Sequence, residues 1–307
     1  MTALRTTFAG LAFQNPIVLA SGTAAYGREL DDIVDLDALG GIVTKAVSLT
    51  PRPGAKAPRV SDFPGGMINA IGLANPGVHV VRDTELPWLA AHLSKARVLV
   101  NVVGNAVEDF AEVVTTLDAS AGVSGYEMNV SCPNVKAGGM EFGADRVVLR
   151  ALIERARSAT RKTIVIKLSP TLTDLAGTAQ VCADAGADAI TLTNTMPGLV
   201  IDVETRRPRI GFGSGGVSGP PLLPIGVLAT WRVSRAVSLP IIGLGGVSRA
   251  EHALQYLMAG ATLVGVGTAG MVDPRAPERI VAGLTGWCER HGVRSLDAVR
   301  GTLEWPS

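Results

Sequence analysis

The sequence predicts an α/β protein in which eight β/α units form one TIM barrel. Three observations support this prediction: short apolar runs recur along the chain, segments of helical length separate them, and the length of 307 residues suits one large barrel. Runs that are apolar on both faces are typical of parallel strands buried between helices. Strand counting leaves an open, doubly wound sheet as the alternative.

The apolar runs are rich in Val, Ile and Leu. The predicted strands are Pro16–Ala20, Gly41–Lys45, Val98–Val103, Gly125–Val130, Thr163–Leu168, Ala189–Thr193, Pro240–Leu244 and Thr262–Val266. Amphipathic or alanine-rich segments between them predict helices over Arg28–Leu39, Val107–Leu117, Asp145–Ala159, Thr173–Ala185, Leu222–Ala236 and Arg249–Ala259. Because no linker or break in composition divides the chain, we expect a single domain over residues 1–307.

The composition narrows the class of ligand. Hydrophobic residues make up 47% of the chain, and a net charge of +1 offers no general attraction for nucleic acid or an anionic membrane. We therefore expect a small ligand. The segment Met1–Phe8 lacks the apolar core of a signal peptide, and no run of about 18 apolar residues occurs. These features predict a cytoplasmic protein without membrane segments.

The ends of the predicted strands indicate where a site lies. A TIM barrel carries its active site at the carboxyl ends of its strands, and nearly every predicted strand here ends in a polar residue or glycine. These residues are Ser21-Gly22, Lys45, Asn101 and Asn105, Asn129 to Cys132, Lys167 and Ser169, Thr193 to Thr195, Gly245-Gly246, and Gly267-Thr268. Lysines and amides at the ends of apolar strands predict one convergent pocket.

Cys132 is the candidate acid–base residue. It lies in the run Tyr126-Glu-Met-Asn-Val-Ser-Cys-Pro-Asn134, where polar groups and a rigid proline surround a thiol whose pKa its environment can tune. The alternative is that Cys132 is a small buried hydrophobe, as we expect for Cys182 and Cys288 in their helical patterns. The three cysteines form no CxxC pair and have no metal-ligand spacing, so we expect no metal site. The four histidines lie away from the strand ends, which disfavours a Cys-His nucleophilic pair.

Two glycine-rich turns predict a phosphate site. Gly243–Ser248 and Gly265–Gly270 follow the last two strands and expose backbone N–H groups, which favour an anion. Neither turn matches a complete dinucleotide fingerprint. The alternative is that these glycines only allow close packing.

Lys167 suggests the kind of phosphate ligand. A cation at the end of a buried strand suits a cofactor that gains negative charge in turnover, as a reduced flavin does. The alternative for Lys167 is a buried ion pair with Glu127. Lys45 offers a different chemistry, because a barrel lysine of low pKa can form a Schiff base as in aldolases.

Taken together, the motifs of the chain resemble those of the class 1 dihydroorotate dehydrogenases, and most of all the class 1B catalytic subunits. The resemblance spans nearly the whole chain. It rests on Asn15-Pro-Ile-Val-Leu-Ala-Ser-Gly22, Thr44-Lys45, Pro51-Arg-Pro-Gly54, Asn69-Ala-Ile-Gly-Leu-Ala-Asn75, Asn129-Val-Ser-Cys-Pro-Asn134, Lys167-Leu-Ser-Pro170, Asn194-Thr195, Gly215-Gly-Val-Ser-Gly-Pro220 and the two glycine turns. The resemblance implies an FMN-dependent TIM barrel that oxidises (S)-dihydroorotate to orotate in the biosynthesis of pyrimidines (UMP).

The resemblance also implies roles for individual residues. The implied FMN contacts are Ser21, Lys45, Ala46, Asn101, Asn129, Lys167 and Thr193, with Gly219, Gly245, Gly246, Gly267 and Thr268 around the phosphate. The implied substrate contacts are Lys45, Asn69, Ala70, Ile71, Gly72, Leu73, Asn129, Asn194 and Thr195. Cys132 and Lys45 are the implied catalytic residues, and Cys132 takes the C5 proton while the C6 hydride passes to the flavin.

The final electron acceptor depends on the class. Class 1B implies a partner subunit that carries FAD and an iron–sulfur cluster and passes electrons to NAD, with a homodimer of this chain as the core of a heterotetramer. Class 1A implies a homodimer that uses fumarate, whereas the membrane-bound class 2 enzymes have an added N-terminal region and a serine base. A dihydropyrimidine dehydrogenase subunit and a non-catalytic flavin-binding barrel are the remaining alternatives. The glycines within Pro133–Phe142 suggest a lid over the substrate.

Overall fold

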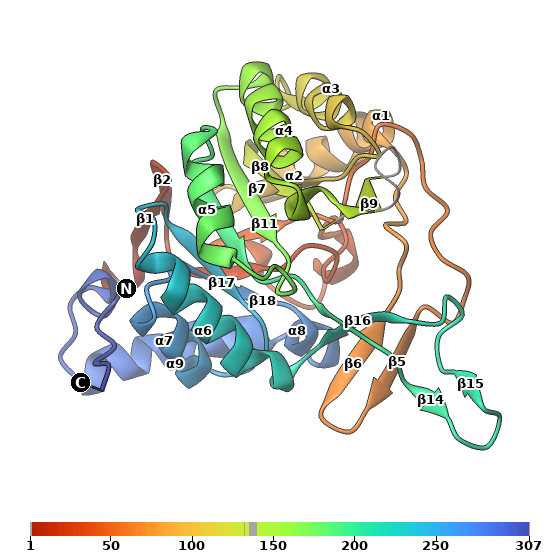
Figure 1. Ribbon diagram of the computed structural model, residues 1–307. Coiled ribbons are helices and arrows are strands. Elements are labelled where there is room, and N and C mark those ends of the chain that lie inside the picture. The colour runs from red at the N-terminus through yellow and green to blue at the C-terminus, as the bar shows by residue number, and fades with distance from the viewer. Residues whose placement is uncertain (1, 132, 135–139, 307) are drawn as a thin grey trace.

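In the computed structural model, eight parallel strands close into a barrel (Figure 1), which confirms the predicted TIM fold. The structure describes residues 2–131, 133–134 and 140–306. Each strand pairs with its sequence neighbours in the barrel, and β18 closes it by pairing with β3. The barrel strands are β3 (Ile17–Leu19), β4 (Gly41–Val43), β7 (Arg97–Val102), β8 (Val123–Asn129), β11 (Thr163–Leu168), β12 (Ala189–Leu192), β17 (Ile241–Leu244) and β18 (Leu263–Val266). All eight coincide with predicted strands, within two residues at each end.

Helices cover the outside of the barrel. Five of the six predicted helices are present, namely α3 (Val107–Leu117), α4 (Arg146–Ala159), α5 (Leu175–Asp184), α6 (Leu223–Ser234) and α7 (Ala250–Met258). Further helices that we did not predict are α1 (Val78–Val80), the π-helical turn η4 (Val81–Glu85), α2 (Leu86–His92), α8 (Thr268–Val272) and α9 (Ala276–Arg290). Short 3₁₀ turns occur at Thr2–Leu4, Phe142–Ala144, Pro220–Leu222 and Leu296–Ala298.

The helix predicted over Arg28–Leu39 is wrong. Two 3₁₀ turns, η2 (Arg28–Leu30) and η3 (Leu36–Ala38), replace it. The side chain of Asp35 accepts a hydrogen bond from the Ala38 backbone N–H at 3.2 Å. Aspartates compete with helical hydrogen bonds in this way, and the segment carries several of them.

Aspartates also determine where two of the barrel helices begin. Asp145 accepts hydrogen bonds from the backbone N–H groups of Val147 at 2.9 Å and Val148 at 3.1 Å, at the start of α4. Asp174 does the same for Gly177 at 2.9 Å, at the start of α5. Such N-caps satisfy donors that have no partner inside the helix.

A hairpin closes the amino end of the barrel. It consists of β1 (Thr6–Phe8) and β2 (Leu11–Phe13), paired antiparallel. Phe8 and Phe13 are buried, meet edge to face at 6.0 Å, and join a cluster with the inward side chains of barrel strands. This apolar cluster fills the amino end of the barrel, so the polar groups at the carboxyl ends of the strands are the candidates for ligand binding.

Insertions build a second, smaller sheet at the carboxyl end of the barrel. Figure 1 shows its hairpin arms extending to one side of the barrel. The sheet has the order β13 (Met196–Gly198), β16 (Gly215–Ser218), β6 (Gly66–Asn69) and β5 (Val60–Phe63). Two short pairs accompany it, β14 (Ile201–Asp202) with β15 (Arg207–Pro208), and β9 (Pro133–Asn134) with β10 (Met140–Glu141). This sheet brings the segment after β12 against the Asn69 loop.

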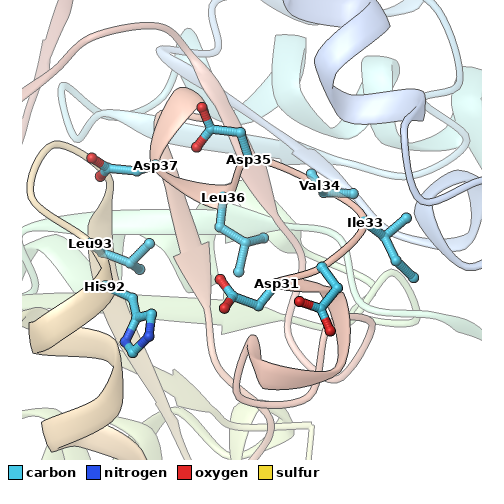
Figure 2. A pocket seen from close by; sticks show the side chains of 9 residues that line it. Asp31, Ile33, Val34, Asp35, Leu36, Asp37, His92 and Leu93 are labelled. Atoms are coloured by element: carbon cyan, nitrogen blue, oxygen red, sulfur yellow. The ribbon is translucent and has the colours of Figure 1, made fainter.

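A pocket near the amino ends of β4 and β7 lies away from the predicted site (Figure 2). Its walls are the segment Asp31–Asp37 and the end of α2 at His92 and Leu93. Asp37 Oδ1 accepts hydrogen bonds from three consecutive backbone N–H groups, those of Ser94 at 2.9 Å, Lys95 at 2.7 Å and Ala96 at 2.9 Å. Partial burial opposes ionisation of Asp37, but these hydrogen bonds outweigh it and hold its pKa below the usual value. We infer that this carboxylate has a structural role.

We expect Asp37→Asn to lower the free energy of unfolding at neutral pH by about 1 kcal/mol, because charge-assisted hydrogen bonds become neutral ones. The Asp37 pKa is lower in the folded than in the unfolded chain, so its stabilisation is present above the unfolded value of about 4 and is lost as pH falls through the folded value. Urea denaturation from pH 7 to pH 3 checks this, with Asp32→Asn on the same pocket as the control. Equal stability of the two variants at pH 7 would contradict the expected result.

Candidate active site

A buried polar network occupies the inside of the barrel where strands β7, β8, β11 and β12 lie side by side. Asn101 pairs in register with Glu127, and Lys167 pairs with both Asn129 and Thr191. The Asn101 amide donates to Glu127 Oε1 at 2.7 Å, and the Thr191 hydroxyl donates to Glu127 Oε2 at 2.7 Å. These side chains therefore form one connected cluster that is almost completely withdrawn from solvent.

Lys167 links this cluster to the end of β3. Its ammonium donates a hydrogen bond to Ser21 Oγ at 3.0 Å and lies 3.8 Å from Glu127 Oε1. The ion pair with Glu127, weighed as the alternative for Lys167, is thus present, but 3.8 Å is too long for a direct hydrogen bond. The ammonium keeps donor capacity for a ligand while a carboxylate offsets its charge.

Two of the predicted FMN contacts have a buried oxygen that lacks a hydrogen-bond partner among the described residues. These oxygens are Asn101 Oδ1 and Thr193 Oγ1. Buried polar atoms in folded proteins are nearly always paired, since an unpaired one costs about 1–3 kcal/mol. Acceptors beside a buried cation suit a flavin ring, which has an N–H group and an electron-rich edge. The residues here therefore fit FMN.

The glycines after β16 and β17 form a close backbone approach at the predicted phosphate region. Gly219, Gly245 and Gly246 have positive φ angles of 102°, 132° and 68°, and a Cβ at Gly246 would lie 2.6 Å from the Leu223 backbone nitrogen. The hydroxyl of Tyr256 donates to the Gly245 carbonyl at 2.8 Å and fixes the turn. These positions require glycine for steric reasons.

The next turn differs from this one in its backbone. A Cβ at Gly267 would meet its nearest neighbours at 3.7 Å, so the space around this residue does not exclude a side chain. The adjacent Thr268 hydroxyl donates to Ser218 Oγ at 2.8 Å. This contact brings the end of β18 beside the strand that precedes Gly219.

The predicted substrate residues come together from three distant segments. Asn194 donates to Asn129 Oδ1 at 3.2 Å and accepts from the Thr195 backbone N–H at 2.9 Å. The Thr195 side chain packs against Gly216, where a Cβ would lie 2.0 Å from its Oγ1. The Asn69 amide donates to the Gly216 carbonyl at 3.2 Å. A continuous chain of contacts therefore joins the ends of β8 and β12 to β6.

The loop from Asn69 to Leu73 is held by hydrogen bonds on both sides. Ala70 N–H donates to Arg59 at 2.8 Å, and the Ile71 carbonyl accepts from Ala55 at 3.0 Å. Gly72 and Leu73 adopt positive φ angles of 69° and 55°. The buried amide of Asn75 donates to the Leu73 carbonyl and to Ser48 Oγ, both at 2.8 Å. We did not assign Asn75 a role from the sequence, although it ends one of the motifs.

Lys45 and Ala46 lie at the carboxyl end of β4. The Lys45 backbone N–H donates to Ala25 at 2.8 Å, and the Tyr26 hydroxyl donates to the Ala46 carbonyl at 3.2 Å. The Lys45 side chain is half-buried. Within the described part of the chain, its ammonium makes no hydrogen bond to another predicted site residue. Its predicted role therefore rests on position alone.

Cys132 lies outside the described residues, as does the middle of the predicted lid, residues 135–139. The described residue before it, Ser131, has a buried hydroxyl without a partner among the described residues. After the gap, burial raises the pKa of Glu141 despite a hydrogen bond from Ser169. We did not predict Glu141 as a site residue, because the prediction followed the ends of the barrel strands and Glu141 lies on β10, outside the barrel.

The side chains and helices of the described residues limit the class of site. They contain no group of three or more His, Cys, Asp and Glu side chains that could hold a metal ion. They also contain no helix that is long and apolar enough to cross a membrane.

The fold and site define a TIM-barrel enzyme with a buried lysine, carboxamides and a glycine cradle at one end of the barrel. Comparison with known proteins is specific: residues 3–287 match the dihydroorotate dehydrogenase family. The chain therefore belongs to the dihydroorotate dehydrogenase family, a family of flavoprotein oxidoreductases in pyrimidine biosynthesis.

Individual relatives agree with this assignment. The chain is 46% identical over 296 residues to the dihydroorotate dehydrogenase B (NAD(+)) catalytic subunit of Pelobacter propionicus, covering 96% of this chain and 97% of the relative. It is 45% identical over 302 residues to a putative dihydroorotate dehydrogenase A (fumarate) of Solibacter usitatus, covering 98% and 99%. The crystal structure of DHODH from Eimeria tenella with ferulenol has the same fold, with a TM-score of 0.82 at 23% identity, covering 97% of this chain and 88% of that one. The predicted resemblance to class 1B catalytic subunits is confirmed.

Proposed function

We propose that this chain oxidises (S)-dihydroorotate to orotate with FMN as its resident cofactor. The observation that carries the proposal is the buried Lys167 at the carboxyl ends of the barrel strands, where Asn101 and Thr193 each have a buried oxygen without a partner among the described residues. A cation and buried acceptors at one place match the flavin ring better than they match an apolar ligand.

The chain offers a complete set of residues for FMN. Ser21, Lys45, Ala46, Asn101, Asn129, Lys167 and Thr193 would hold the ring and ribityl chain, while Gly219, Gly245, Gly246, Gly267 and Thr268 would hold the phosphate. The exposed backbone N–H groups of such turns favour an anion. When bound, FMN supplies the acceptor for the hydride that leaves C6 of the substrate.

The substrate needs a cation for its carboxylate and paired donors and acceptors for its ring. Lys45 would supply the charge, and Asn69, Asn129, Asn194 and Thr195 would supply the hydrogen bonds. The backbone of Ala70, Ile71, Gly72 and Leu73 would line the same side. We assign Cys132 as the base that takes the C5 proton as the C6 hydride departs, so that a C=C bond forms and two electrons leave the substrate.

We further propose that electrons leave through a partner subunit that carries FAD and an iron–sulfur cluster and reduces NAD. The printed names of relatives as catalytic subunits of a B (NAD(+)) enzyme support this arrangement. Four exposed apolar side chains between β13 and β16 also support it, since large exposed apolar residues often mark interaction surfaces. They are Leu199 and Ile201, both 55% exposed, Val203 at 77% and Phe212 at 69%. A homodimer of this chain at the core of a heterotetramer completes the proposal.

A fumarate-using homodimer of class 1A is the second candidate. The Solibacter usitatus relative named for fumarate is nearly as similar to this chain as the relatives named for NAD. The two candidates share the oxidation of dihydroorotate and differ in the acceptor.

Anaerobic mixing of the purified yellow chain with dihydroorotate tests the reaction and the acceptor together. We expect rapid bleaching of the flavin, reoxidation by an artificial dye, and negligible reduction of NAD without a partner. Bleaching by dihydrouracil instead would indicate a dihydropyrimidine dehydrogenase subunit, and no bleaching by either would indicate a non-catalytic barrel. Rapid turnover with fumarate would place the chain in class 1A, whereas rapid NAD reduction by the pure chain would contradict the need for a partner.

A further inference from the structure

Glu127 is a carboxylate enclosed in the barrel at a position where the proposed reaction gives it no role. It is 1% exposed and lies two residues before Asn129 on β8, so both side chains face the same side of the strand. Its two oxygens accept from the Asn101 amide and the Thr191 hydroxyl, each at 2.7 Å. Removing a carboxylate from water is costly, so a buried one is normally retained for the hydrogen bonds and ion pairs that it makes with neighbouring groups.

The hydrogen bond to Glu127 determines how the Asn101 amide is turned. A carboxylate only accepts hydrogen bonds, whereas a carboxamide has a donating and an accepting end. The Asn101 Nδ2 must therefore face Glu127, and Oδ1 must face away from it. That Oδ1 is buried and has no partner among the described residues. The orientation leaves an acceptor for a ligand N–H group.

The same carboxylate also affects Lys167. Its Oε1 lies 3.8 Å from the Lys167 ammonium, which in turn donates to Ser21 Oγ at 3.0 Å. The ammonium thus lies between the segment that follows β3 and strand β8, and the negative charge of Glu127 offsets part of its field in the low-dielectric interior. Glu127 therefore affects both the Lys167 ammonium, which can donate to a ligand, and Asn101 Oδ1, which can accept from one.

We propose that Glu127 is a positioning residue for the flavin: it turns the Asn101 amide so that Oδ1 accepts from the flavin ring N–H, and it moderates the charge of Lys167. The inference rests on the proposed FMN site and adds a residue outside the predicted set. Two effects follow: loss of the carboxylate weakens FMN binding, and it moves the midpoint potential of the bound flavin to more positive values. The second effect arises because an uncompensated Lys167 stabilises the negative charge of reduced flavin more strongly.

Exchanging the amide and the carboxylate of Asn101 and Glu127 tests the orientation of the Asn101 amide. The apoprotein of each variant is titrated with FMN, and the quenching of flavin fluorescence reports binding. Glu127→Gln can donate as well as accept, so it no longer determines the direction of Asn101, and we expect the dissociation constant to rise about tenfold. Asn101→Asp places two carboxylates against each other and should weaken binding at least as much. The double variant Asn101→Asp, Glu127→Gln restores a donor facing an acceptor with the same total charge, and should bind within a few-fold of wild type.

The outcomes separate this proposal from the proposed function. A wild-type chain that does not bind FMN overturns both. Tight wild-type binding with an unchanged dissociation constant in Glu127→Gln, or no recovery in the double variant, overturns only the role of Glu127. So does an unchanged midpoint potential in Glu127→Gln measured by equilibration with redox dyes.

A second pair of variants covers the case in which Glu127→Gln does not fold. Thr191→Val removes the hydroxyl that holds Glu127 Oε2 at 2.7 Å, whereas Thr191→Ser keeps it. We expect a several-fold weaker FMN affinity for the valine variant only. Equal affinities of these two variants would contradict the positioning role.

Discussion

Replacing Lys167 by alanine is expected to weaken FMN binding about 10- to 100-fold and to slow flavin reduction by dihydroorotate. Lys167 is 4% exposed, and its ammonium has only Ser21 and the more distant Glu127 as partners among the described residues, so it can also donate to the flavin. Hydrogen bonds to a charged group contribute about 1.5–3 kcal/mol, and the interior of the barrel screens charge poorly. FMN titration and anaerobic stopped-flow absorbance measure the two effects.

A second substitution, at the buried carboxylate Glu127, separates the effect of Lys167→Ala on stability from its effect on FMN binding. Lys167→Ala leaves Glu127 without its countercharge, which by itself should lower the free energy of unfolding by about 3 kcal/mol. The double variant Lys167→Ala, Glu127→Gln should regain much of that stability but not the FMN affinity. If affinity and reduction rate in Lys167→Ala both equal those of wild type, Lys167 is purely structural.

Replacing Cys132 by serine is expected to preserve the yellow colour and to slow flavin reduction by about 10²- to 10⁴-fold at neutral pH, which is the usual contribution of a general base. A serine hydroxyl has a far higher pKa than a thiol and is a poor base at pH 7. Part of the rate should return as the pH rises toward 10. The reduction rate at saturating dihydroorotate, measured across this pH range, checks the expected result.

Two further cysteine variants make the test specific. Cys132→Ala has no group to ionise and should show no alkaline recovery. Cys288→Ala changes a buried thiol on α9 and should keep the wild-type rate. A Cys132→Ser chain with full activity at neutral pH would remove Cys132 from the mechanism.

The barrel strands were predictable because each is a short apolar run buried on both faces, as in Thr163–Leu168, where every residue is buried. The error at Arg28–Leu39 has a local cause, since aspartate side chains there form turns. The insertion sheet was missed for a different reason. Its order brings β6 beside β16, about 150 residues later in the chain, and the intervals between apolar residues do not encode such pairings.

The sequence by itself determined the number of barrel strands, the family, and which residue types stand at the ends of those strands, because burial and backbone geometry restrict those positions locally. Only the tertiary structure decided how these residues meet. Hydrogen bonds join Asn194 to Asn129, Asn69 to Gly216, and Lys167 to Ser21, and the two residues of each pair are far apart in the sequence. The structure also revealed a further role for Glu127. The sequence indicated only an ion pair with Lys167, whereas the structure shows that Glu127 also accepts hydrogen bonds from Asn101 and Thr191. Hydrogen bonds are directional and depend on distances of a few tenths of an ångström, so barrel closure and strand register determine them, not the order of residues along the chain.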